Sequence, residues 1–256
     1  MSRFVNLEFN HEAEGRTQTP LVKDEAYYLA EAQSAFEQAQ FETALRSYAK
    51  VLEFNPKHIL AWTGQVRALI ELGEYQKARL WADQALERFP NESELLSAKA
   101  VALARSGDLQ GALAFSDAAV EERGDTSYIW LARGDVMLAR AEQRADYCFE
   151  KALALAPRNW FVAWLAARIR YFYEQFAPAL KLAQQALEWN PGQSTLWLLT
   201  GLCQRQVGLT EAARISLHQA RQLNPQCSEA AQALRKLAAE GLGSKLRGLW
   251  RRLTSP

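Results

Sequence analysis

The feature that most constrains this chain is a proline that recurs about every 34 residues and closes a similar phrase each time. Pro90, Pro157 and Pro191 end the stretches ALERFP, ALALAP and ALEWNP, and Pro56 and Pro225 fall at the same interval. Self-similarity at this period is typical of an array of helical hairpins, each of which buries its apolar face against its neighbours. The 256 residues therefore indicate one elongated array rather than one or two globular domains.

Counting back from each proline divides the chain into six units whose internal positions agree. Small residues prevail at the eighth position of each unit, and alanine stands at every twentieth position. Two helices that cross at close distance leave no room for a larger side chain, and overpacking such a crossing typically costs about 1–3 kcal/mol. The eighth positions are Ala32, Val66, Ala100, Gly134, Ala167 and Gly201, and the twentieth are Ala44, Ala78, Ala112, Ala145, Ala179 and Ala213.

Larger residues surround these small positions in fixed register, as in the stretch WTGQVRALIELGEYQKARLWADQALERFP. This pattern resembles the tetratricopeptide repeat family, whose signature combines a tryptophan or leucine, a small residue, aromatic residues, alanines and a proline. The resemblance covers residues 25–227 and implies an all-α fold, a right-handed α-solenoid of six helix-turn-helix repeats. Gly124 replaces the proline of the third unit, and the fourth unit is one residue short near Ala139. Neither departure should break the array, because glycine also ends helices and a shorter turn changes only the local tilt.

The expected organisation has four parts. An irregular N-terminal extension covers residues 1–24, a capping helix covers 228–240, and a basic amphipathic tail covers 241–256. The six repeats between them are expected at 25–58, 59–92, 93–126, 127–159, 160–193 and 194–227. The cap should cover the last hairpin with Ala231, Leu234, Leu237 and Ala238, which are spaced for one helix face. The extension has an apolar cluster around Phe4, which fits a loose leader, a segment docked in the groove or one ordered by a partner.

A concave groove lined by the first helix of each hairpin is implied by the resemblance. Aromatic residues and arginine at the centre of such a groove are the types that carry most binding energy at protein interfaces. Arginine also pairs with carboxylates or a chain terminus. We therefore expect a protein or peptide partner, bound mainly near the fifth unit. The predicted partner-binding residues are Arg67, Arg105, Tyr128, Phe161, Trp164, Arg168, Tyr171, Phe172 and Arg205.

Packing roles are the alternative for several of these aromatic residues. Trp62, Trp130 and Trp197 stand at signature positions and are interpreted as structural. Trp160 and Trp164 do not fall on signature positions, so recognition and packing remain open for them.

Internal ion pairs are the alternative for the arginines, because Glu71 and Asp135 also stand at inward-facing positions. Some members of the family hold acidic chaperone tails through lysine and asparagine at the fifth and ninth positions. The second unit has Thr63 and Arg67 there instead, so this clamp is not expected.

The C-terminal tail combines apolar and basic residues behind a break at Gly241 and Gly243. If residues 244–253 form a helix, Leu246, Leu249, Trp250 and Leu253 share one face. Such a stretch can fold back on the cap, contact a partner protein or lie weakly on an anionic membrane, where each basic residue contributes about 1 kcal/mol. The predicted tail contacts are Lys245, Arg247, Trp250, Arg251 and Arg252.

Composition and the remaining residue types argue against other function classes. The net charge of +1 gives no bulk attraction to nucleic acid, and no run of about 20 apolar residues or secretory signal is present. The chain is therefore expected in the cytoplasm, with peripheral membrane contact through the tail at most. The three cysteines lack CxxC spacing, which predicts neither a disulfide nor a zinc site. The histidines are scattered along the sequence and form neither an HExxH motif nor a pair with cysteine, so no metal or catalytic site is predicted. No cofactor, small-molecule substrate or enzymatic activity is expected.

Two functions follow from the sequence. The leading one is a non-enzymatic scaffold or adaptor that binds a peptide or partner segment in the concave groove. The alternative is an assembly subunit that its basic amphipathic tail holds to a membrane or a larger complex.

Overall fold

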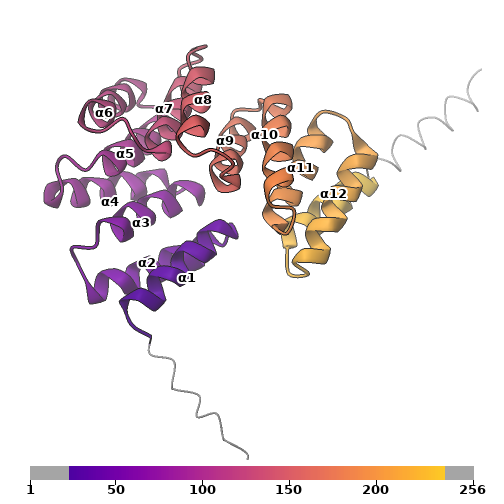
Figure 1. The fold of residues 1–256 in the computed structure, drawn as a ribbon, viewed down its shortest axis with the longest axis horizontal. Helices are drawn as coiled ribbons and strands as arrows, with labels where there is room; N and C mark the ends of the chain where they lie inside the picture. The colour runs from indigo at the N-terminus through magenta and orange to yellow at the C-terminus, as the bar shows by residue number, and fades with distance from the viewer. Residues whose placement is uncertain (1–22, 240–256) are drawn as a thin grey trace, which may run out of the picture.

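The computed structural model describes residues 23–239, in which all regular secondary structure is helical. Consecutive helices pack as hairpins that follow one another along a curved path from α1 to α12 (Figure 1). The predicted fold class, an all-α solenoid, is confirmed, whereas the division of the chain into domains stays a prediction. The helices are α1 (Glu25–Glu37), α2 (Phe41–Phe54), α3 (Ile59–Glu71), α4 (Tyr75–Arg88), α5 (Ser93–Arg105), α6 (Leu109–Glu122), α7 (Ser127–Ala139), α8 (Ala145–Leu155), α9 (Trp160–Phe172), α10 (Phe176–Trp189), α11 (Ser194–Gln206) and α12 (Thr210–Leu223), followed by a helical segment over residues 228–239.

Small residues stand where the two helices of a hairpin cross. The alanines at the eighth and twentieth positions of the units are almost completely buried. A Cβ atom added to Gly134 would lie 2.8 Å from the ring of Phe149, and one added to Gly201 would lie 2.7 Å from Leu217. Because real Cβ atoms do not approach other carbon atoms so closely, these glycines set the distance between the paired helices.

Each hairpin turns at the fifteenth position of its unit, where the backbone is left-handed in all six cases. In three units the residue in this conformation is a glycine, which adopts it without steric penalty: Gly73, Gly107 and Gly208. The other three turns place Ala39, Ala141 and Glu174 there, with φ between 56° and 58°. These side chains add local strain, since a non-glycine residue in this region typically costs about 1–2 kcal/mol.

The tryptophans at the fourth position fasten one unit to the end of the preceding unit. The indole Nε1 of Trp62 donates to the carbonyl oxygen of Pro56 at 2.9 Å, and Trp197 does the same to Pro191 at 2.7 Å. Trp130 donates to the carbonyl of Gly124 at 2.8 Å, so the residue that replaces proline in the third unit still supplies the acceptor. The structural interpretation of these three tryptophans is supported.

The fourth unit is shorter than the others, and its junction with the fifth unit contains a buried arginine. Helix α8 has 11 residues, whereas α10 has 14. Arg170 of α9 is only 7% exposed. Its guanidinium group lies 4.5 Å from the centre of the Phe149 ring, donates to Oε1 of Gln175 at 2.6 Å and forms an ion pair with Asp146 of α8. The side chain of Arg170 therefore packs against the Phe149 ring, while its charge is paired with the exposed carboxylate of Asp146.

The helical segment over residues 228–239 covers the last hairpin. Its buried residues are Ala230, Ala233 and Leu237, which join Leu198 and Leu217 in one apolar cluster. Of the expected face, Leu237 is buried and Leu234 packs against the cluster, whereas Ala231 is only partly buried and Ala238 is exposed. Spacings of three and four residues place the buried side chains on the same side of a helix, as the packing requires.

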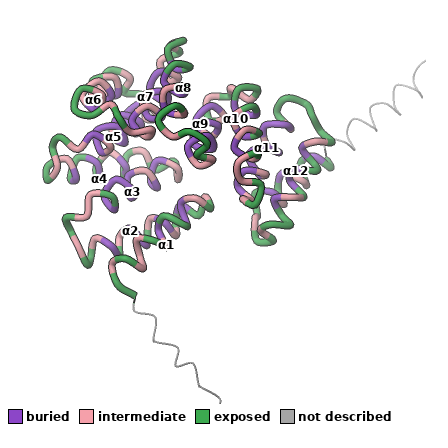
Figure 2. The backbone as a smooth tube through the Cα atoms, viewed as in Figure 1, coloured by how far each residue is buried: buried purple, intermediate pink, exposed green. Residues whose placement is uncertain are grey.

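The first helices of the units form the inner wall of the array. Buried residues are concentrated on α3, α5, α7 and α9, whereas α4 and α6 bury mainly alanines (Figure 2). Curvature brings the first unit against the fifth and sixth. The rings of Phe36 and Phe161 lie 6.1 Å apart edge to face, and Oγ1 of Thr195 lies 3.5 Å from the carbonyl oxygen of Glu37. The groove is thus partly closed by its own walls.

Candidate interaction groove

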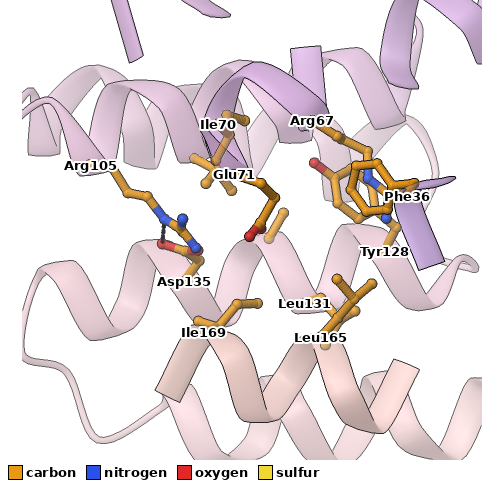
Figure 3. Close-up of a pocket in the computed structure, with 12 residues that line it drawn as sticks. Phe36, Arg67, Ile70, Glu71, Arg105, Tyr128, Leu131, Asp135, Leu165 and Ile169 are labelled. Carbon is orange, nitrogen blue, oxygen red and sulfur yellow. Dashed lines mark hydrogen bonds and ion pairs between the residues drawn. The ribbon is translucent and has the colours of Figure 1, made fainter. Parts of the chain in front are cut away.

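The inner wall contains a small central cavity and two open clefts beside it. The central cavity, of about 30 Å³, lies between α1, α3, α5, α7 and α9 (Figure 3). The Phe161 cleft, of about 340 Å³, is lined by Gln33, Phe36, Glu37, Tyr48, Leu60, Thr63, Gly64, Arg67, Glu94 and Phe161. The Phe172 cleft comprises two adjoining hollows of about 590 and 500 Å³, lined by Ile70, Glu71, Leu72, Gly73, Tyr75, Arg105, Arg168, Tyr171, Phe172, Glu174, Phe176, Leu199, Leu202, Gln206 and Glu229, and by Ala39, Gln40, Phe41, Glu42 and Thr43.

Arg105 and Asp135 form a buried ion pair across α5 and α7. The Nη2 atom of Arg105 lies 2.6 Å from Oδ2 of Asp135, and the two side chains are 6% and 1% exposed. The hydroxyl of Tyr173 donates to Oδ1 of the same carboxylate at 2.7 Å. Burial and the neighbouring Asp135 charge raise the pKa of Tyr173 far above its usual range, so this hydroxyl stays a donor. The charge of Arg105 is therefore already matched within the protein.

Glu71 of α3 lies among three arginines. Arg168 of α9 donates to it through Nε at 3.1 Å and through Nη2. Burial disfavours the charged form of Glu71, but Arg168, Arg105 and Arg67 together hold its pKa below the ordinary value. The Arg168 guanidinium also lies over the ring of Phe41, 4.9 Å from its centre. Arg168 therefore links the fifth unit to the first and second units.

Arg67 is held by aromatic rings instead of a carboxylate. Its guanidinium carbon lies 3.9 Å from the centre of the Tyr128 ring and 5.1 Å from that of Phe36 (Figure 3). Burial raises the pKa of Tyr128 well above its usual range, so the ring carries a neutral hydroxyl. This stacking between α1, α3 and α7 closes the central cavity on the side of the Phe161 cleft.

The fifth unit contributes both buried and accessible aromatic residues. Trp164 is 1% exposed and stacks on Phe161 at 5.5 Å between ring centres. Phe172, by contrast, is 44% exposed at the end of α9, where the Arg105 guanidinium lies 4.3 Å from its ring centre. Tyr171 packs edge to face on Phe176 at 5.4 Å. Accessible aromatic surface in this unit therefore gathers in the Phe172 cleft.

The charge of the Phe172 cleft is negative. Four carboxylates line it against two guanidinium groups, and both guanidinium groups are paired, Arg105 with Asp135 and Arg168 with Glu71. Within residues 23–239, the carboxylates of Glu42, Glu174 and Glu229 form no ion pair or hydrogen bond. The rim of the cleft thus presents uncompensated negative charge beside aromatic side chains.

Seven of the nine predicted groove residues line these hollows, and their surroundings differ from the expectation of a positive groove. The alternative interpretation, an internal ion pair, describes Arg105 and Arg168 in the structure. Trp164 lies inside the packing against Phe161, and Arg205 is partly buried on α11 beside Gln206, which lines the Phe172 cleft. A binding role for each of the nine stays a prediction.

Sequence reasoning missed Tyr173 and the acidic rim. The partners Glu71 and Asp135 stand at the same inward-facing positions as the arginines, which was the signal for their pairing. Glu229 could not be found from the groove pattern because it lies on the segment over residues 228–239, beyond the last hairpin.

Some predictions concern residues that the structure does not describe. The tail contacts Lys245, Arg247, Trp250, Arg251 and Arg252, and the extension over residues 1–22, lie outside the described range. For the part that is described, no helix has the length and apolar character needed to cross a membrane. No group of three or more His, Cys, Asp or Glu residues between 23 and 239 is placed to hold a metal ion.

Comparison with known proteins agrees with this architecture. Tetratricopeptide repeat family models match residues 35–102 and 82–128. A tetratricopeptide repeat protein from Parabacteroides merdae has a solved structure with a TM-score of 0.56, at 18% identity and 87% coverage of both chains. The APC/C hetero-tetramer Cut9–Hcn1 aligns with a TM-score of 0.51, at 14% identity over 84% of this chain and 49% of the other.

A curated relative is the BBSome complex member BBS4 of Bos taurus, 22% identical over 184 residues. The match covers 72% of this chain but only 36% of that relative's length. These likenesses are too distant to carry over residue roles, and they bear on the fold.

Proposed function

Since the chain is a tetratricopeptide repeat protein, we propose that it is a non-enzymatic scaffold that binds an apolar segment of a partner protein in the Phe172 cleft. Repeat arrays of this kind present extended concave surfaces for protein partners. The proposal places recognition at the end of α9, where Tyr171 and Phe172 border the cleft. The buried arginines then maintain the shape of the groove.

One observation carries the proposal: an aromatic side chain that is 44% exposed stands in a hollow of about 590 Å³. Large apolar side chains at the mouth of a concave site are typical of surfaces that bury them on binding. Phe172, Tyr171 and Phe176 come from consecutive helices whose packing fixes their positions, so little ordering is needed when a segment binds.

Two of the similar proteins belong to assemblies by name, the BBSome member and the Cut9–Hcn1 complex. Membership of an assembly supports a scaffold role for this chain without naming its partner. The partner segment is defined here by chemistry alone, as one with an apolar or aromatic side chain that enters the hollow beside Phe172.

The proposal is tested by affinity capture from extracts of the source cells with Phe172→Ala. We expect this change to remove the specific partner, because loss of a central aromatic contact typically costs about 2 kcal/mol or more of binding. Leu80→Ala is the matched control, since Leu80 is 64% exposed on α4, outside the cleft. Partner capture that is equal for wild type, Phe172→Ala and Leu80→Ala would refute the assignment.

A further inference from the structure

The Phe172 cleft combines aromatic lining residues with a negative rim, and this combination selects its occupant. The unpaired carboxylates of Glu42, Glu174 and Glu229 favour a segment with positive charge. Tyr75, Tyr171 and Phe172 favour a segment with leucine or tryptophan side chains. A basic amphipathic segment meets both requirements, whereas an acidic peptide would add its charge to a rim that is already negative.

Such a segment is present in the chain itself. Residues 245–253 have the sequence KLRGLWRRL, with four basic residues and apolar Leu246, Leu249, Trp250 and Leu253. We propose that this C-terminal segment binds in the Phe172 cleft of its own chain and occupies the surface at which a partner would bind.

The end of the described chain lies within reach of the cleft. Glu229 lines both hollows of the cleft and belongs to the helical segment over residues 228–239, whose last residue is Ala239. Ten helical residues separate Glu229 from Ala239 by about 15 Å. Six further residues, 240–245, span up to about 20 Å when extended, which is enough to bring Leu246 back to the cleft. Gly241 and Gly243 permit the reversal of direction that this return requires.

Covalent attachment strengthens this contact. A short flexible connection places a segment at an effective concentration on the order of millimolar, so a weak intrinsic affinity is enough for occupancy. A partner with a stronger basic and apolar segment would displace the tail, and the tail would thereby exclude weaker ligands from the cleft. The proposal rests on the proposed function only for this competition, because binding of the tail itself requires no partner.

Photo-crosslinking in the full-length chain tests the contact. The photoreactive residue p-benzoylphenylalanine replaces Trp250, and the crosslinked products are mapped by mass spectrometry after irradiation of the purified protein. We expect intramolecular crosslinks to the end of α9 and to α11, near Phe172 and Leu202. The same photoreactive residue in place of Ile215, which is 63% exposed on α12, should give no such products.

The charge of the rim provides the second measurement. Glu174→Lys combined with Glu229→Lys should lower the crosslinking yield from position 250 by about fivefold, because two attractive contacts become repulsive. Both residues are exposed, so the folded array should keep its helical circular dichroism. The doubly substituted chain Gln184→Lys and Gln222→Lys, changed at exposed positions of α10 and α12, is the matched control and should keep the wild-type yield.

Several outcomes would overturn the proposal. Crosslinks that form only between isotopically distinct copies would assign the tail to a second molecule. Crosslinks confined to α12 or to residues 228–239 would assign it to the cap, and transfer of the crosslink from the cleft to anionic lipid vesicles would assign it to a membrane. Each of these results leaves the partner-capture experiment with Phe172→Ala unaffected, so the two proposals fail separately.

Discussion

Asp135→Asn should be among the most destabilising single substitutions in the inner wall. Its carboxylate is 1% exposed and accepts from Nε of Arg105 at 3.1 Å, from Nη2 at 2.6 Å and from the hydroxyl of Tyr173 at 2.7 Å. The amide keeps the shape of the side chain but removes the charge, so the buried guanidinium group of Arg105 loses the carboxylate with which it is directly paired. Breaking a buried pair by removing one partner typically costs about 3–5 kcal/mol.

Urea unfolding followed by circular dichroism measures this cost. With a denaturant dependence of about 3 kcal/mol per molar for a chain of this size, the expected loss lowers the midpoint by about 1 M or more. Glu53→Gln, which breaks the exposed pair with Lys50, is the control and should leave the midpoint unchanged. In the double variant Arg105→Met with Asp135→Asn, the combined loss should be about 1–3 kcal/mol smaller than the sum of the single losses.

If Asp135→Asn lowers the midpoint no more than the control does, the buried pair does not stabilise the fold. Additive losses in the double variant would show that the cost comes from separate packing defects and not from the pair.

Three further predictions concern the charge network and the repeat geometry. Burial opposes the ionisation of Glu71, but its arginine neighbours lower its pKa below the ordinary 4.5. The ionised carboxylate therefore stabilises the fold above pH 4.5, and this contribution is lost as the pH falls through the pKa of the folded state. The gap in urea midpoint between wild type and Glu71→Gln should therefore narrow from pH 7 to pH 3, and a constant gap would contradict the pairing. Ala141→Gly removes the strain of a left-handed residue at φ 56° and should raise the urea midpoint. Gly107→Ala at the equivalent turn should lower the free energy of unfolding by about 1 kcal/mol, and the midpoint with it. Gly134→Ala places a Cβ atom 2.8 Å from Phe149 and should cost about 1–3 kcal/mol, which a thermal melt would register; an unchanged melt would show that the helices can separate freely.

The regular part of this fold was predictable from the sequence because it depends on contacts within a unit or between neighbours. Alanine or glycine at most helix crossings, tryptophan at the fourth position of three units and a turn at the fifteenth position of all six follow the period. The exceptions also involve neighbouring residues only. Ala141 and Glu174 occupy the turn without the conformational freedom of glycine, and the buried Arg170 contacts Asp146 and Phe149 of the adjacent helix α8.

The candidate site was less predictable because it depends on contacts between units that are far apart in the sequence. Inward-facing positions could be assigned by the repeat, but the pairing of Arg168 with Glu71 joins residues separated by 97 positions. That pairing depends on how far the array curls, which no single repeat specifies. The shortened fourth unit, whose second helix has 11 residues, is a further departure from the regular pattern.

The carboxylates determine which groove residues stabilise the inner wall and which face an occupant of the cleft. Arg105 and Arg168 are not available as a free positive surface, since Asp135 and Glu71 pair with them inside the wall. Arg105 joins the third unit to the fourth, and Arg168 joins the fifth unit to the first and second units. Pairing them leaves the acidic rim uncompensated, and this sets the charge that an occupant of the Phe172 cleft encounters. A substitution that breaks an inner pair would therefore change recognition as well as stability, because it frees a guanidinium group beside the rim. Glu71→Gln should accordingly weaken the crosslinking of the basic tail to the cleft, and a yield equal to that of wild type would separate the inner network from recognition.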